Sequence, residues 1–178
     1  MPKCIYCVRE INQNQTVMEF DDKDTIETKK LIPAKRVNVV TIKMIKESSV
    51  LYKNRKVNSP TDAYNLIKDF FDFADREELF VCSLDTKNVP ITINLCSIGT
   101  LNTSLVSPRE VFKTAILSNA ASILLYHNHP SGCPNPSNED ISITHRLKEC
   151  GKLLGIELVD HIIVGDGIFI SLKEKGIL

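Results

Sequence analysis

The chain has 178 residues, of which 43% are hydrophobic and 25% are charged, and its 22 basic and 22 acidic side chains give no formal net charge. This composition excludes wholesale disorder and collagen-like structure, and the length predicts one domain with a small appendage. Because no apolar run approaches the ~18 residues of a membrane span and the N-terminus lacks the apolar segment of a signal peptide, we expect a cytoplasmic protein without a membrane partner.

Charge is unevenly distributed along the chain. Residues 1–60 carry 12 Lys/Arg and 7 Asp/Glu, whereas residues 61–178 carry 10 and 15. Nine basic residues and a single acid, Glu47, lie between Lys29 and Lys56. Such a segment could contact nucleic acid or an acidic partner, or could be the solvated face of a strand and loop. We therefore expect at most weak DNA contact through residues 29–56.

The six cysteines give a weak signal. Only Cys4 and Cys7 form a Cys-x-x-Cys pair, and no second pair completes a structural zinc site downstream. In the cytoplasm we expect reduced thiols, with the scattered four acting as small packing residues. The Cys4/Cys7 pair is either incidental, in a frayed tail, or half of a metal or redox site.

The first third of the chain predicts few regular elements. Residues 1–35 lack hydrophobic periodicity and are typical of a poorly ordered arm. The β-branched residues of 37–45 predict a strand. Ser59 followed by Pro60 is typical of a helix N-terminus, and the apolar spacing predicts an amphipathic helix over residues 60–75.

Strands and helices alternate through the rest of the chain. Ser107 and Glu110 predict a second helix that begins with a capping box. The remaining expected elements are strands over 79–85, 89–98 and 121–126, a helix over 138–153, and a closing hairpin of 156–164 with 168–171. This order predicts an α/β fold, with helices packed on a central mixed sheet in two or three layers. Functional residues are then expected where strand ends meet helix N-termini.

The most informative residues follow the third of these strands. His127 and His129 can point the same way, because strand side chains alternate. Asp140 lies in the first turn of the following helix if Ser137 is its N-cap, and a proline-rich loop would bring that turn back to the strand end. Two His and one Asp leave one open position on a tetrahedral zinc ion, as in catalytic sites.

Other interpretations of these histidines are weaker. A structural pair, in which each ring binds a backbone carbonyl, is an alternative. The Pro-Cys-x-x-Cys of zinc deaminases and the His-Glu-x-x-His of thermolysin-type enzymes are both missing. Asp160 and His161, in a later strand, are expected to form a hydrogen-bonded pair that orients a loop or supports the site.

The spacing of His127, His129, Ser137 and Asp140 resembles the His-x-His-(x)7-Ser-(x)2-Asp pattern of the JAMM motif in JAB/MPN metalloproteins. The string HNHPSG and the later DHIIVG are similar to the RadC branch of that superfamily. The resemblance covers about residues 58–178 and leaves residues 1–57 as a basic N-terminal arm. It implies a cytidine-deaminase-like layered JAB/MPN fold, with one zinc ion per chain held by two His and one Asp. It also implies hydrolysis of a peptide or isopeptide bond in an unidentified protein or peptide substrate, through a zinc-activated water.

The resemblance further implies a catalytic Glu upstream. Glu77 matches the position and Glu78 is the second candidate, whereas Glu110 has a structural explanation in the predicted capping box. Ser137 would donate a hydrogen bond to the developing oxyanion, or alternatively would cap the third helix.

Two other classes of function remain open. One is a DNA-associated accessory protein with a structural zinc, and the other is an interaction module or a hydrolase of a different amide. Many RadC-like proteins carry an N-terminal helix-hairpin-helix region, which residues 1–57 do not match. This mismatch weakens the DNA interpretation.

Overall fold

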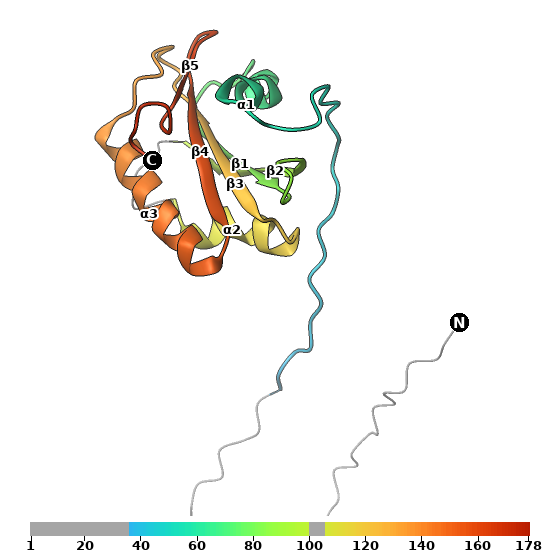
Figure 1. The fold of residues 1–178 in the computed structure, drawn as a ribbon. Helices are drawn as coiled ribbons and strands as arrows, with labels where there is room; N and C mark the ends of the chain where they lie inside the picture. Colours follow the sequence, from blue (N-terminus) through green and yellow to red (C-terminus); the bar gives the residue numbers. More distant parts are fainter. Residues whose placement is uncertain (1–35, 100–105) are drawn as a thin grey trace, which may run out of the picture. The chain divides into compact units, whose positions relative to one another are not determined.

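The computed structural model describes residues 36–99 and 106–178 (Figure 1). Contacts divide the chain into two units, Met1–Ile42 and Lys43–Leu178. The predicted arm of residues 1–35, with Cys4 and Cys7, lies outside the described residues. Within the described ranges, no helix is long and apolar enough to cross a membrane.

The strand predicted over residues 37–45 is wrong. Residues 36–50 form neither helix nor strand, and their side chains are exposed. β-branched residues favour a strand when neighbours pack against them, and Val39 and Ile45 are 101% and 86% exposed. The sequence preference alone is therefore not sufficient here.

The sheet is mixed, as predicted. Its strands are β1 (Glu78–Leu84), β2 (Pro90–Ile98), β3 (Ser122–Asn128), β4 (Glu157–Val164) and β5 (Phe169–Ser171). Their order across the sheet is β2-β1-β3-β4-β5. Among the strands of the described ranges, β3 and β4 alone pair in parallel. A helix connects these two strands, as a parallel connection requires.

The helices are α1 (Pro60–Ile67), the following 3-10 turn η1 (Lys68–Phe70), α2 (Pro108–Leu117) and α3 (Asn138–Leu154). The helix predicted over 60–75 therefore ends early. Phe70 and Phe71 pack edge-on against Phe80 of β1, and the tighter turn at η1 accompanies this contact.

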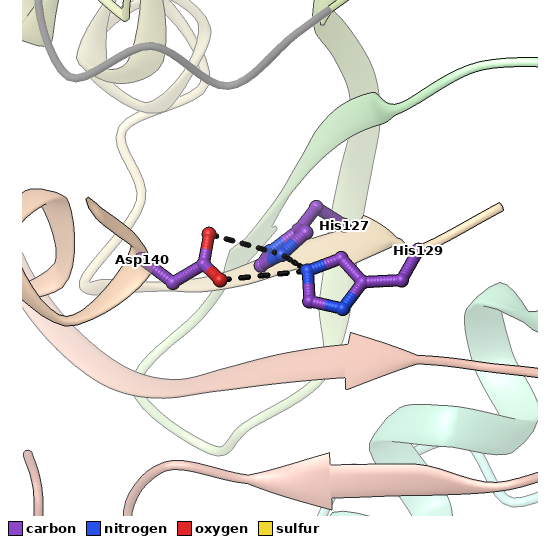
Figure 2. A group of neighbouring side chains, drawn as sticks. All are labelled: His127, His129 and Asp140. Atoms are coloured by element: carbon purple, nitrogen blue, oxygen red, sulfur yellow. Dashed lines mark hydrogen bonds and ion pairs between the residues drawn. The ribbon is translucent and has the colours of Figure 1, made fainter. Parts of the chain in front are cut away.

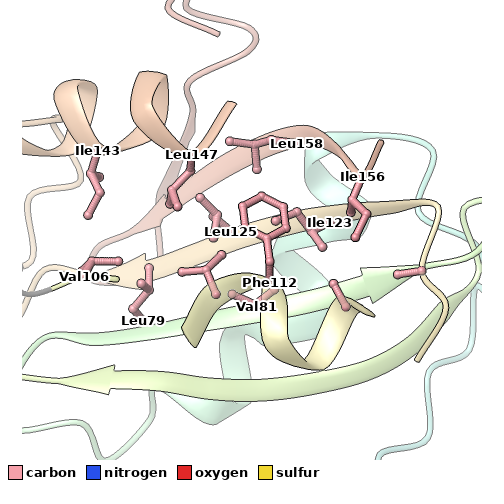
Figure 3. Close-up of a cluster of buried hydrophobic side chains, with 13 residues drawn as sticks. Leu79, Val81, Val106, Phe112, Ile123, Leu125, Ile143, Leu147, Ile156 and Leu158 are labelled. Carbon is pink, nitrogen blue, oxygen red and sulfur yellow. The ribbon is translucent and has the colours of Figure 1, made fainter. Parts of the chain in front are cut away.

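Helices cover both faces of the sheet, which makes three layers (Figure 1). Leu79 and Val81 of β1 face a core that also contains buried residues of α2 and α3 (Figure 3). Phe80 and Cys82, which alternate with them, face a second core with α1. This alternation follows from the two-residue period of a strand.

A β-bulge in β4 decides which side chains face α3. Ile123 of β3 pairs with Leu158, and the next residue of β3 pairs with Asp160, so Val159 is the extra residue. Leu158 packs in the core with α2 and α3, whereas Ile162 packs in the core with α1. The bulge therefore places His161 on the face of the sheet that α3 covers.

Candidate metal centre

The C-terminal end of β3 presents two histidines (Figure 2). Every residue of β3 is buried, and His127 is 0% exposed. His129 lies just beyond the strand, where its backbone N–H donates to the carbonyl of Val164 at 2.8 Å. Because this bond continues the pairing with β4, both imidazoles extend from a rigid backbone.

The third side chain comes from the N-terminus of α3. Ser137 is the N-cap, and its hydroxyl oxygen accepts a hydrogen bond from the Asp140 backbone N–H at 3.1 Å. In return, a carboxylate oxygen of Asp140 accepts from the Ser137 backbone N–H and from its hydroxyl, each at 2.7 Å. This capping box fixes the carboxylate of Asp140, whose residue is buried although Ser137 and the two residues between them are exposed.

The structure brings these three side chains to one point. The Nε2 atoms of His127 and His129 are 2.9 Å apart, and they lie 3.2 and 3.4 Å from the two carboxylate oxygens of Asp140. Ligand atoms of a tetrahedral zinc ion lie roughly 3.3–3.6 Å from one another. Within the described ranges, this is the group of His, Cys, Asp or Glu side chains whose geometry could hold a metal ion.

The proton positions also suit a cation. Nδ1 of His129 lies 2.8 Å from the carbonyl oxygen of Cys133, which can only accept. Nδ1 therefore carries the hydrogen, and Nε2 of the neutral ring offers a lone pair toward the carboxylate of Asp140. A lone pair and an anion that face each other at this distance are stabilised by a positive charge between them.

Electrostatics keep Asp140 ionised. Burial alone would raise the pKa of Asp140, but its interactions with the two imidazoles of His127 and His129 hold that pKa well below its usual range. Burial lowers the pKa of His127. The hydrogen bond with Asp140 raises the pKa of His129, so a proton on that ring can neutralise the site when no metal is bound.

Glu77 lies close enough for its charge to raise the pKa of both imidazoles. This effect is smaller than the effects of burial and of Asp140. Asn128, between the two histidines, holds the backbone on either side of Glu77. Its side-chain oxygen accepts from the N–H of Glu78 at 2.7 Å, and its amide donates to the carbonyl of Arg76 at 3.0 Å. Asn128 is not among the site residues predicted from the sequence, although a buried amide at this position must find hydrogen-bond partners.

The remaining candidates differ from expectation. Ser107 makes no side-chain cap bond, and the exposed Glu110 pairs with Lys113 one turn later, so the capping box predicted for α2 is wrong. The hydroxyl of Ser137 is engaged with Asp140, which favours the helix-capping alternative. Its role toward an oxyanion stays a prediction.

Comparison with known proteins identifies the class. The family described as the RadC-like JAB domain matches residues 57–177, and the chain belongs to this family. It is 47% identical over 165 residues to a UPF0758 protein of Clostridium acetobutylicum, covering 91% of this chain and 72% of the relative. A UPF0758 protein of Clostridium kluyveri gives the same figures. A third, from Clostridium botulinum (strain Okra), is 48% identical over 145 residues, which are 80% of this chain and 64% of the relative. The predicted family is confirmed, and the names of these relatives state no activity.

Proposed function

We propose that this chain is a zinc-dependent hydrolase of the JAMM type that cleaves a peptide or isopeptide bond. One observation carries the proposal: ligand atoms of His127, His129 and Asp140 converge from β3 and α3 within 4.8 Å of one another. Membership in the RadC-like JAB domain family supports the same chemistry. The set of two imidazoles and one carboxylate is the type found in catalytic zinc sites.

The three side chains would hold one zinc ion per chain. Such an ion would leave a position for water and lower the pKa of that water toward ~7. Asp140 contributes the negative charge, and its bonds to Ser137 keep it in place before the metal arrives. The protein therefore needs little rearrangement on binding.

Glu77 is proposed as the general base that takes a proton from the attacking water and returns it to the leaving amine. The two bonds of Asn128 to the neighbouring backbone support this choice, because they fix the segment beside the histidines. Glu78 is the first residue of β1, and the alternation of strand side chains directs it differently from Glu77.

Ser137 is the remaining catalytic candidate. A hydroxyl has a single hydrogen, and here it points to the carboxylate of Asp140. To stabilise an oxyanion, Ser137 would have to release that bond. The proposal for this residue therefore depends on a rotation of its hydroxyl during the reaction.

The test combines elemental analysis with a peptide-release screen on the full chain. The native protein should contain one zinc per chain and release peptide. Glu77→Gln should keep its zinc and fold but lose activity by roughly 10²–10⁴-fold, because glutamine can bond the water but cannot accept its proton. Glu78→Gln is the matched control and should change little.

Two outcomes would contradict the proposal. If the double variant His127→Ala/His129→Ala still holds one zinc, the metal lies elsewhere and Cys4 with Cys7 become the candidates. If Glu77→Gln and Glu78→Gln both keep full activity, the base has been misassigned. A dead Glu78→Gln beside an active Glu77→Gln would instead shift the base by one residue.

A further inference from the structure

A buried chain of hydrogen bonds connects two of the proposed metal ligands through side chains that are not ligands. Nδ1 of His127 lies 2.8 Å from Nε2 of His161, and Nδ1 of His161 lies 2.6 Å from the hydroxyl of Thr144. That hydroxyl in turn lies 2.6 Å from the backbone carbonyl of Asp140. None of the three linked side chains contacts solvent, because His127, His161 and Thr144 are each 0% exposed.

The carbonyl of Asp140 gives this chain a direction. A carbonyl oxygen only accepts, so the single hydrogen of the Thr144 hydroxyl points to it. The hydroxyl oxygen must then accept from Nδ1 of His161, which therefore carries a hydrogen. In a neutral ring, the opposite nitrogen of His161 is an acceptor.

The ring of His161 stays neutral for two reasons. The ring is 0% exposed, and a charged imidazole taken out of water is costly unless an anion pairs with it. The neighbouring carboxylate of Asp160 bonds the backbone N–H of His161, the hydroxyl of Ser171 and the backbone of Lys173 instead of the imidazole. Because Nε2 of His161 accepts, Nδ1 of His127 must donate, which leaves the lone pair of His127 on Nε2.

We propose that Thr144 and His161 are positioning residues that fix His127 in the tautomer with its hydrogen on Nδ1 and its Nε2 lone pair toward the metal. The inference rests on the proposed metal site. Side-chain partners that fix the ring of a metal-binding histidine are a general feature of such sites. Here the partner is a neutral histidine, whose accepting nitrogen is itself dictated by a threonine on the same helix as Asp140.

The first test needs no variant and no metal. In the ¹⁵N spectrum of the imidazoles of metal-free protein, His127 should show a protonated Nδ1 and an unprotonated Nε2. His161 should show the same pattern. A spectrum with the hydrogen of His127 on Nε2 would overturn the proposal, whether or not the protein is a hydrolase.

The second test measures zinc affinity by chelator competition. Thr144→Val keeps the side-chain shape but removes the hydroxyl, and it should weaken zinc binding by about 10–100-fold, the range for lost partners of ligating histidines. Thr144→Ser keeps the hydroxyl and should bind as the native protein does. The ¹⁵N spectrum of Thr144→Val should show a mixture of His127 tautomers.

The outcomes separate this inference from the proposed function. Native affinity in Thr144→Val, with an unchanged His127 spectrum, would overturn the role of Thr144. Zinc binding that weakens as expected in a protein without hydrolytic activity supports the positioning role and contradicts only the proposed function. Weak binding by Thr144→Ser as well as Thr144→Val would show sensitivity to packing, and would also overturn the proposal.

Discussion

At the scale of single residues, the candidate site combines side chains that are close in the chain with one contact between distant segments. His127, His129 and Asp140 lie within 14 residues, on a strand end and a helix start whose patterns are both clear. The bonds of Asn128 reach back about fifty residues to the segment before β1. That contact depends on the pairing of β1 with β3, which no local pattern specifies.

Substitution of Asn128 should separate positioning from metal binding. Asn128→Ala leaves the partly buried N–H of Glu78 and the carbonyl of Arg76 without these partners, which should cost about 1–3 kcal/mol of unfolding free energy. We expect kcat to fall because the segment with Glu77 loosens, while zinc content stays at the native value. Chemical denaturation, elemental analysis and kinetics on one preparation check this. Asn128→Asp retains only the acceptor, so its stability and kcat should lie between those of the native protein and of Asn128→Ala. A native kcat in Asn128→Ala would contradict the positioning role of Asn128.

At the scale of elements, strand and helix interiors were predicted well and their ends less well. The observed ends of three elements, β1, β3 and α3, lie within two residues of the predicted positions. In these elements the hydrophobic pattern and the capping residues of the sequence indicate the same boundaries. The strand at 37–45 was wrong because its residues lack packing partners, and the bulge at Val159 was not predicted. A bulge depends on the pairing of two strands, so the sequence of β4 alone contains no signal for it.

The N-cap of α3 yields a prediction that distinguishes the two roles of Ser137. Ser137→Ala removes the acceptor for the Asp140 N–H and a donor to its carboxylate, so we expect about 1–2 kcal/mol lower stability together with weaker zinc binding. Ser137→Thr keeps the hydroxyl and should restore both. A role limited to the oxyanion would instead lower kcat by roughly 10²–10³ with unchanged zinc affinity. Thermal unfolding and chelator competition tell these results apart.

The turn after β4 supports the loop that leads to α3. A Cβ on Gly165 would collide with the carbonyl of Gly132 and with Pro134, and the loop also provides the Cys133 carbonyl that bonds His129. Gly165→Ala should therefore shift the loop, costing about 1–3 kcal/mol and weakening zinc binding.

Gly167→Ala, in the same turn, is the control for Gly165→Ala. Gly167 has a φ of +68° and open space around it, so this substitution should cost stability through backbone strain but leave zinc affinity unchanged. Chelator competition on both variants checks the difference. Equal zinc affinities in the two variants would show that the close approach at Gly165 does not matter for the site.

At the scale of the molecule, the proposed chemistry lies within the family domain, whereas the basic segment lies before it in the sequence. The family match begins at residue 57, and the basic stretch ends at Lys56. All six Lys and Arg side chains among residues 36–56 are exposed. Val57, by contrast, is only 8% exposed and packs in the core with α1, so a truncation of residues 1–57 would damage the domain as well as remove the charges.

Charge reversal is therefore the better test of DNA binding. If residues 29–56 contact DNA, log affinity should fall with log salt with a slope of about −0.9 per neutralised phosphate. The triple variant Lys43→Glu/Lys46→Glu/Lys53→Glu should then weaken binding and flatten the slope by about 3, while its zinc content stays native. We expect weak binding at most, because residues 36–50 form no helix or strand that would hold these charges in a fixed array.

Fluorescence anisotropy with duplex DNA at several salt concentrations measures both the DNA affinity and its dependence on salt. Tight binding that survives charge reversal would place the DNA contact on another surface, and no binding at low salt would eliminate the DNA-associated alternative.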